Sequence, residues 1–392
     1  MRSKSIVLIA SMLWFAGLAI RVPILVVPPI LPFIRADLNM SGTEIGVLSG
    51  IPMILLALAA VPGSAMVSKL GALRAVLVGI LIAAIGGALR GLAFTTAVLF
   101  VTTAIASAGI AITQPAMPAI VKEWLPSRIG FGTAVYSNGL VAGCIFPVAI
   151  TLSLIMPSIG NNWRLDLVLW SLPVFATFLY LLIGAPKTVA GPESTLQLTG
   201  FFSKFDFSLI WKIGLIFGAN NCVFFGTNAF LPPYLVQTGH ADLVTAALTA
   251  YNITQLPGSF LVVALAHWME RRHWPYVCAG FGLVLGIAWL ASSSGTWTIA
   301  AAMTLGLFSG VTLATGLMLP PLLSRPGDVA RTAAGMFTLS YTLAMLGSVM
   351  GGAAWDLFGH PRFAFWVLAV CALPLIVITP AISFRQASFS IN

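Results

Sequence analysis

The 392-residue chain is 59% hydrophobic and only 7% charged, and its mean hydropathy is +1.01. A soluble domain of this size would carry roughly 25% charged residues, so the composition excludes an ordinary water-soluble fold and predicts an integral membrane protein. The net charge of +9 does not indicate a nucleic-acid partner, because Lys and Arg stand singly between hydrophobic runs and form no stripe with exposed aromatic residues.

The hydrophobic runs are continuous and have the length of membrane-spanning helices, whereas barrel strands would be shorter and alternate in polarity. Twelve runs predict an all-α membrane protein, with spans at 6–34, 44–67, 73–94, 97–120, 129–154, 165–183, 209–235, 243–267, 274–292, 297–319, 332–354 and 363–383. The first run, despite its basic start, is interpreted as an uncleaved helix because it is too long for a signal peptide.

A long polar interruption divides the chain into residues 1–184, a linker at 185–208, and residues 209–392. Short motifs recur in the same order on both sides of it, which predicts two six-helix bundles related as a tandem repeat. With a cytoplasmic N-terminus, 14 of the 19 Lys and Arg residues lie on the cytoplasmic side. The positive-inside rule therefore places both termini and the linker in the cytoplasm of a bacterial-type plasma (inner) membrane.

Arg21 is the ionisable residue that lies near the middle of a predicted span. A charge at that depth costs at least about 2.5 kcal/mol on insertion scales, so it indicates a functional site that faces a cavity or a partner. The alternative is a structural cation bound to carbonyl groups that Pro28 and Pro29 leave free. Arg90, near the outer end of the third span, is interpreted as an anchor that snorkels to the surface.

All ten Asp and Glu residues, and all four His residues, map to loops or helix ends. A cavity with a fixed guanidinium and no acid attracts small anions and repels organic cations. Glu44 and Asp242, at the outer starts of the second and eighth spans, are the remaining candidates for a coupling proton, so symport, anion exchange and facilitated diffusion stay open. The four isolated Cys residues predict no metal site, and no cofactor is expected.

Several motifs resemble those of a known family. In the first three helices they are Arg21 with VPPILP at 27–32, SGTEIGVLS at 41–49 and GGALR at 86–90, and the most specific stretch is GIAITQPAMPAIVKEW at 109–124. They resemble the cyanate permease and 2-nitroimidazole transporter family of the major facilitator superfamily, to which residues 228–232 are similar in the second half. The resemblance implies a monomeric, twelve-helix carrier that moves a small solute across the lipid bilayer by alternating access.

In that superfamily the inner loop between helices 2 and 3 carries an acid, then basic residues around a Gly. Lys69, Gly71 and Arg74 keep the basic part of this pattern, but Ser68 stands where the acid belongs. This departure weakens the expectation of a latch built on that carboxylate. The equivalent region of the second half offers an acid beside bases at Glu270 and Arg271, and these residues together form the predicted gating loops.

Uncharged polar side chains on several spans lie within about two helical turns of the depth of Arg21. The resemblance implies that helices 1, 4, 5, 7, 8 and 11 line a central cavity. The residues predicted to bind the substrate with Arg21 are therefore Gln114, Tyr136, Asn138, Asn220, Asn221, Tyr251, Asn252 and Tyr341. The alternative for each is an ordinary hydrogen bond to a neighbouring helix.

The sequence lacks the Gly-Lys pair of a phosphate-binding loop, which excludes a primary pump, and it offers no deep acid pair or metal ligands for an enzyme. The predicted function is a secondary active or facilitative transporter of a small anionic or weakly acidic solute. Such a solute contains nitrogen and resembles cyanate, with Arg21 as its anchor. The alternative is an exporter of a neutral or heterocyclic compound, such as a nitroimidazole, in which Arg21 serves structure or gating.

Overall fold

The computed structural model describes residues 3–59, 70–125, 128–186, 207–269, 272–324 and 329–382. These residues form helices and contain no β-strand. The helices before residue 187, called here the first half, are α1 (Ser3–Leu25), α2 (Val27–Leu38), α3 (Gly42–Leu58), α5 (Ala72–Leu89), η1 (Arg90–Leu92), α6 (Thr96–Trp124), α7 (Ile129–Ile150), η2 (Thr151–Ile155), α8 (Met156–Ser158) and α9 (Trp163–Gly184).

The described helices from residue 207 onward are called the second half. They are α10 (Phe207–Gln237), η3 (Ala241–Leu243), α11 (Val244–Ile253), α12 (Gln255–Ala264), α13 (Ala266–Met269), α14 (Trp274–Ser292), α15 (Trp297–Leu323), α16 (Val329–Phe358), α17 (Arg362–Ala372), α18 (Pro374–Val377) and η4 (Thr379–Ala381). Residues 187–206 of the predicted linker lie outside the described residues.

Ten helical runs in the described ranges are long and apolar enough to cross a membrane. The other two predicted spans correspond to α3, an apolar helix of 17 residues, and to the series α11, α12 and α13, which is interrupted at Thr254 and Leu265. Pro257 accounts for the first interruption, because it has no N–H to donate to the carbonyl one turn earlier. Each of the twelve predicted spans has a helical counterpart, and the all-α prediction is confirmed.

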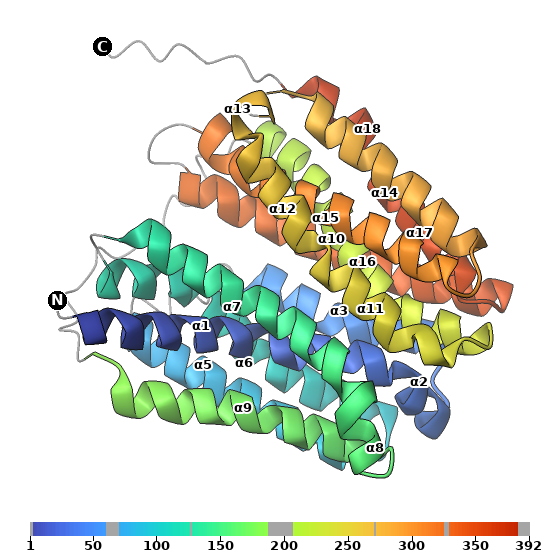
Figure 1. The fold of residues 1–392 in the computed structure, drawn as a ribbon, viewed down its shortest axis with the longest axis horizontal. Coiled ribbons are helices and arrows are strands. Elements are labelled where there is room, and N and C mark those ends of the chain that lie inside the picture. Colours follow the sequence, from blue (N-terminus) through green and yellow to red (C-terminus); the bar gives the residue numbers. More distant parts are fainter. Residues whose placement is uncertain are drawn as a thin grey trace.

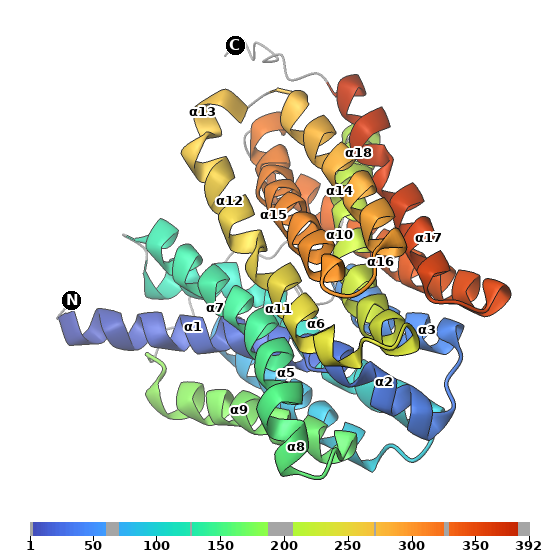
Figure 2. The same cartoon turned by 45° about the vertical axis from the view of Figure 1, so that its right-hand side comes forward.

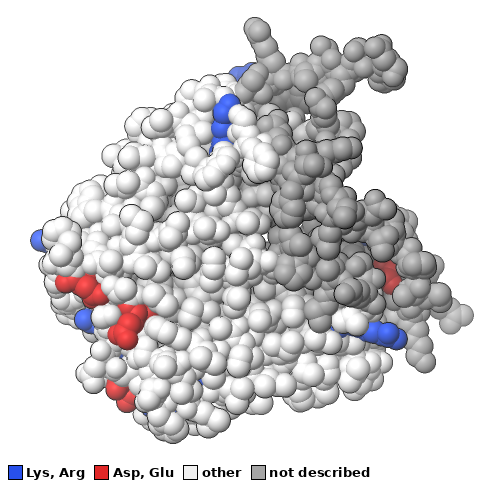
Figure 3. Space-filling view, turned by 180° about the vertical axis from the view of Figure 1, so that it is seen from behind, with Lys and Arg blue, Asp and Glu red and all other residues white. Residues whose placement is uncertain are grey.

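Large apolar side chains point outward from the bundles. Ile183, Phe94 and Leu285 are 84%, 73% and 66% exposed. On the face drawn in Figure 3, charged side chains gather toward the edges and the broad central surface is largely free of them. Contiguous apolar surface of this extent is stable against lipid tails and unstable in water.

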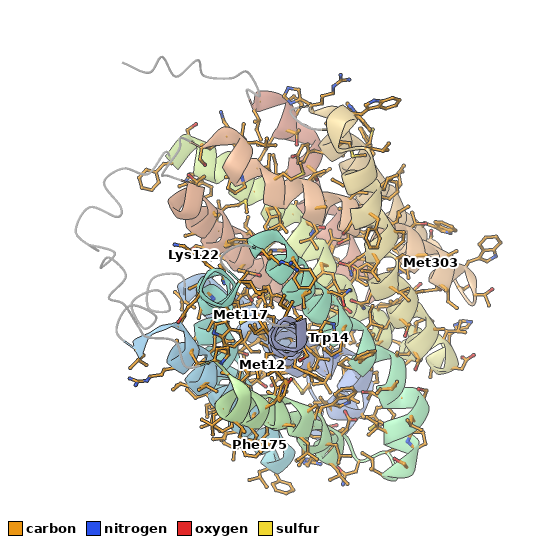
Figure 4. All side chains as sticks on the ribbon, turned by 60° about the vertical axis from the view of Figure 1, so that its left-hand side comes forward. Met12, Trp14, Met117, Lys122, Phe175 and Met303 are labelled. Carbon is orange, nitrogen blue, oxygen red and sulfur yellow. The ribbon has the colours of Figure 1, made fainter. Side chains whose placement is uncertain are left out.

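The two halves form separate groups of helices that meet along one side (Figures 1 and 2). The contacts between them join α3 with α16, α2 with α10, and α7 with α11. From this junction the groups diverge toward the end at which α1 begins (Figure 2). Figure 4 looks nearly along α1, which lies inside the first half and carries the fully buried Met12.

Candidate functional site

Arg21 lies near the middle of the first span, which runs from Ile6 to Leu38. This span is interrupted between α1 and α2 at Val26, because Pro28 and Pro29 remove two backbone donors just beyond that point. Arg21 therefore sits close to the irregular middle of the span. The side chain of Arg21 is half-buried at this position.

The guanidinium of Arg21 has no acidic partner within the described ranges. Its electrostatic neighbours there are the Tyr341 and Tyr136 hydroxyl groups and the Cys144 thiol. Its Nη1 atom is buried and has no hydrogen-bond partner within the described ranges. A buried donor without a partner is costly, and an anionic ligand would satisfy it.

A hydrogen bond across the two halves lies beside this guanidinium. Gln114 Nε2 on α6 donates to Tyr341 Oη on α16 over 3.3 Å, while Gln114 Oε1 is buried without a partner in the part of the chain that is described. Arg21, Gln114, Tyr136 and Tyr341 therefore come together, and we call them the Arg21 cluster. They come from α1, α6, α7 and α16, so both halves contribute.

Aromatic rings form the side of the Arg21 cluster that belongs to the second half. Phe337 stacks on Tyr341 with ring centroids 6.1 Å apart and planes 19° apart. Phe225 on α10 lies 6.5 Å from the same ring, centroid to centroid. The cluster thus combines a cation, one amide and two hydroxyl groups with an apolar, aromatic wall, which is the usual composition of a small-molecule site.

The other five predicted substrate residues make hydrogen bonds within their own half. Asn138 Oδ1 accepts from Trp14 Nε1 (2.9 Å), Asn220 Oδ1 accepts from Ser309 Oγ (2.9 Å), Asn221 Nδ2 donates to Ser340 Oγ (2.7 Å), Tyr251 Oη donates to the Val223 carbonyl (3.4 Å), and Asn252 Nδ2 donates to Asn228 Oδ1 (2.9 Å). Such bonds join neighbouring helices in a membrane bundle. The structure therefore brings four of the nine predicted substrate residues together in the Arg21 cluster. The other five form hydrogen bonds with residues outside this cluster.

The position of Arg90 corrects the sequence interpretation. A snorkelling anchor would reach water, yet Arg90 is only 2% exposed. Its Nη1 donates to the Pro23 carbonyl over 2.9 Å, so the side chain turns inward from the end of α5 to α1. Sequence position alone did not reveal this, because depth along a helix leaves the direction of a long side chain undecided.

Asp166 is a second buried charged residue that the sequence did not single out. It belongs to the first turn of α9, after the N-cap residue Asn162, and its side chain is 0% exposed. Neither carboxylate oxygen has a hydrogen-bond partner within the described ranges. Its place at a helix end matches the sequence analysis, whereas its burial depends on how α9 packs against α5 and η1.

The predicted coupling residues have ordinary surroundings. Glu44 Oε2 accepts from the Ser41 backbone N–H over 2.8 Å, and Ser41 Oγ accepts from the Glu44 N–H, a capping box that starts α3. Asp242 is exposed in η3. Of the predicted gating loops, Gly71 precedes α5 with φ of 81° and Arg74 is exposed, and the other three lie outside the described residues: Lys69, Glu270 and Arg271.

A contact between the halves at the junction of α3 and α16 went unnoticed in the sequence. Asp356, near the end of α16, accepts hydrogen bonds from the backbone N–H groups of Gly42 and Thr43 over 2.5 and 2.7 Å. The same residue accepts from Thr43 Oγ1, and Arg35 lies 4.3 Å over the ring of Trp355. We call these five residues the outer contact. The Asp356 carboxylate is favourable in this position, because the N-terminus of a helix attracts negative charge.

Two six-helix groups with a polar cluster between them define a multi-pass membrane carrier. The profile of the Major Facilitator Superfamily matches residues 8–345, and the chain belongs to that superfamily of transporters. The resemblance seen in the sequence is thereby confirmed.

Two curated relatives span nearly the whole chain. The 2-nitroimidazole transporter of Escherichia coli (strain K12) is 26% identical over 377 residues, which cover 94% of this chain and 93% of that protein. The cyanate transport protein CynX of the same organism is 26% identical over 370 residues, covering 93% and 94%.

Solved structures share the fold at lower identity. A bacterial homolog of the human lysosomal transporter Spinster, in an inward-facing and unoccupied conformation, superposes with a TM-score of 0.76 at 15% identity, covering 98% of this chain and 97% of that one. The nucleoside transporter NupG gives a TM-score of 0.75 at 14% identity, covering 97% and 98%. These similarities concern the fold alone.

Proposed function

We propose that this protein is a secondary active or facilitative transporter that moves a small anionic or weakly acidic solute by alternating access. The observation that carries the proposal is the Nη1 atom of Arg21, which has no hydrogen-bond partner among the described residues, and whose guanidinium lies near residues of both halves and near no described acid. A planar guanidinium offers parallel donors to a carboxylate or a similar anion. An anion held there is bonded to both halves, so its binding favours the state in which they close around it.

The solute class draws support from one relative. CynX is a cyanate transport protein, and cyanate is a small, nitrogen-containing anion that a single guanidinium can hold. The 2-nitroimidazole transporter is equally similar and supports a second candidate, export of a neutral nitro-heterocycle against the rings of Phe225, Phe337 and Tyr341. For this second candidate, Arg21 has a structural or gating role and does not bind the solute.

The proposal includes a location and a topology. Residues 1–184 and 209–392 form the two moving halves, joined by a linker at 185–208 in the cytoplasm. Both termini lie in the cytoplasm of a bacterial-type inner membrane, as the distribution of Lys and Arg favours. The protein acts as a monomer, as its resemblance to the superfamily implies.

Uptake into proteoliposomes tests the role of Arg21. The assay compares labelled cyanate, small carboxylates and 2-nitroimidazole in the unaltered chain, Arg21→Lys and Arg21→Gln. We expect Arg21→Gln to lower anion uptake at least tenfold, since a hydrogen bond to a charged group contributes about 1.5–3 kcal/mol, and Arg21→Lys to keep part of it. Anion uptake that survives Arg21→Gln unchanged would refute the proposal, and loss of 2-nitroimidazole transport alone would support the second candidate.

A further inference from the structure

Arg90 is a second buried cation, and at least one of its N–H groups has no hydrogen-bond partner among the described residues. A guanidinium carries five N–H donors, and the hydrogen bond of Arg90 Nη1 to the Pro23 carbonyl uses one of them. The Nε atom is buried and has no hydrogen-bond partner within the described ranges. No described acid forms an ion pair with Arg90; the ion pair seen in the described residues joins Arg164 to Asp37. Asp166, the buried acid of α9, likewise shows no interaction with it.

A cavity of about 30 Å³ adjoins this guanidinium. Its wall combines residues of α1, α2, α3, η1 and α6 from the first half with Phe225, Asn228 and Ala229 of α10 from the second. Thr103 on α6 lines the cavity, is 3% exposed, and has a buried Oγ1 without a partner in the described part of the chain. None of the nine predicted substrate residues lines it.

Two residues that each carry an unsatisfied buried polar atom, one of them a cation, thus line one small cavity at the junction of the halves. A buried unpaired charge is among the most costly features that a protein can contain. The volume suits one or two water-sized groups, which is the size of a linear triatomic anion or of a carboxylate head and too small for a heterocycle.

We propose that Arg90 and Thr103 form a second anion subsite, in which Arg90 neutralises a small anion and the Thr103 hydroxyl donates a hydrogen bond to it. The subsite rests on the proposed function, because its ligand is the same solute on its path past the Arg21 cluster. Its size selects small linear or planar anions over heterocyclic compounds.

The two sites are neighbours. Pro23, the hydrogen-bond partner of Arg90, lies two residues after Arg21 on α1 and lines the cavity. Phe225 also lines the cavity, and its ring centroid lies 6.5 Å from that of Tyr341 in the Arg21 cluster. An anion leaving Arg21 toward the end of the molecule that carries the outer contact therefore meets Arg90 next. Because both halves form the cavity wall, the subsite changes when the halves separate.

The test uses azide, an unreactive linear triatomic anion, and the purified full-length protein. The infrared antisymmetric stretch of azide distinguishes free anions from anions bound beside a guanidinium, and titration gives the number of bound anions. The variants are Thr103→Val, Arg90→Gln and Arg21→Gln. The matched control is Thr102→Val, because the neighbouring Thr102 Oγ1 donates to the Val98 carbonyl at 2.7 Å and the residue does not line the cavity.

We expect two bound azide bands in the unaltered chain and one in Arg21→Gln. Thr103→Val should lower the affinity of the Arg90 subsite for azide about tenfold, as the loss of a hydrogen bond to a charged group does. It should leave thermal stability unchanged, because the Thr103 hydroxyl has no hydrogen-bond partner among the described residues. Thr102→Val should bind azide normally. If Thr103→Val and Arg90→Gln both bind azide as Thr102→Val does, the subsite does not exist, whereas the role of Arg21 in uptake is unaffected by that result.

Discussion

Tyr341 and Gln114 meet across the two halves at the level of single side chains. The bond of Gln114 Nε2 to Tyr341 Oη and the proximity of that hydroxyl to Arg21 make the phenol oxygen common to both interactions. A neutral hydrogen bond contributes about 1 kcal/mol, and a bond to a charged group contributes more. We therefore expect the hydroxyl to position the amide and the guanidinium for the proposed anion.

Replacing this hydroxyl tests that role. We expect Tyr341→Phe to raise the anion concentration for half-maximal uptake about fivefold, because the change removes about 1 kcal/mol of bonding and leaves the stacking with Phe337 intact. Tyr276→Phe is the matched control, since the Tyr276 hydroxyl donates to the Thr315 carbonyl at 3.0 Å inside the second half. Equal half-saturation values in the two variants would contradict a role for Tyr341 in binding.

At the level of whole helices, α3 and α16 form the most extensive contact between the two halves. A Cβ atom on Gly46 would overlap the Ser348 carbonyl, so glycine permits the two backbones to approach this closely. Beyond it, Asp356 caps the N-terminus of α3 from the other half. The proposed alternating access requires the halves to separate on this side, so we expect the Asp356 contact to break in each transport cycle.

Removing the negative charge of Asp356 shifts the equilibrium between the state that is closed at this contact and the state that is open there. A carboxylate at a helix N-terminus contributes about 1 kcal/mol, so Asp356→Asn should raise the population open on this side roughly fivefold. The measurement is the labelling rate of Ser49→Cys, a residue of the cavity wall, by a membrane-impermeant thiol reagent in a chain whose four native cysteines are replaced.

Asp37→Asn supplies the comparison for that measurement. Its carboxylate pairs with Arg164 at 2.6 Å, and both residues belong to the first half, so loss of this ion pair should leave the labelling rate unchanged. Equal rates in Asp356→Asn and the unaltered chain would show that the contact does not hold the halves together.

At the scale of the molecule, alternating access requires one half to move against the other, and the contact between Thr43 and Asp356 must open for this motion to occur on its side. Thr43 Oγ1 donates to the Asp356 carboxylate across that contact, so a cross-link between these two positions would hold the halves together. We expect Thr43→Cys combined with Asp356→Cys, in a background without native cysteines, to lose uptake on oxidation and to regain it on reduction. Gel mobility checks bond formation, and uptake that persists in the oxidised protein would exclude separation at this point.

The sequence determined the membrane setting, the helical class and the approximate spans, because lipid leaves a chain this apolar no other way to satisfy its backbone. It also singled out Arg21, since charge at mid-span is costly wherever the side chain points. The break at Val26 and the interruption at Thr254 follow from nearby prolines.

Only the tertiary structure decided which polar side chains meet. Asn220 and Gln114 lie at similar depths in their helices, yet one bonds to Ser309 in its own half and the other reaches across to Tyr341. Arg90 points inward to Pro23, and Asp356 caps a helix more than 300 positions away in the chain. Sequence periodicity fixes depth, but the rotation of each helix and the direction of each long side chain depend on the packing partner, which no local pattern encodes.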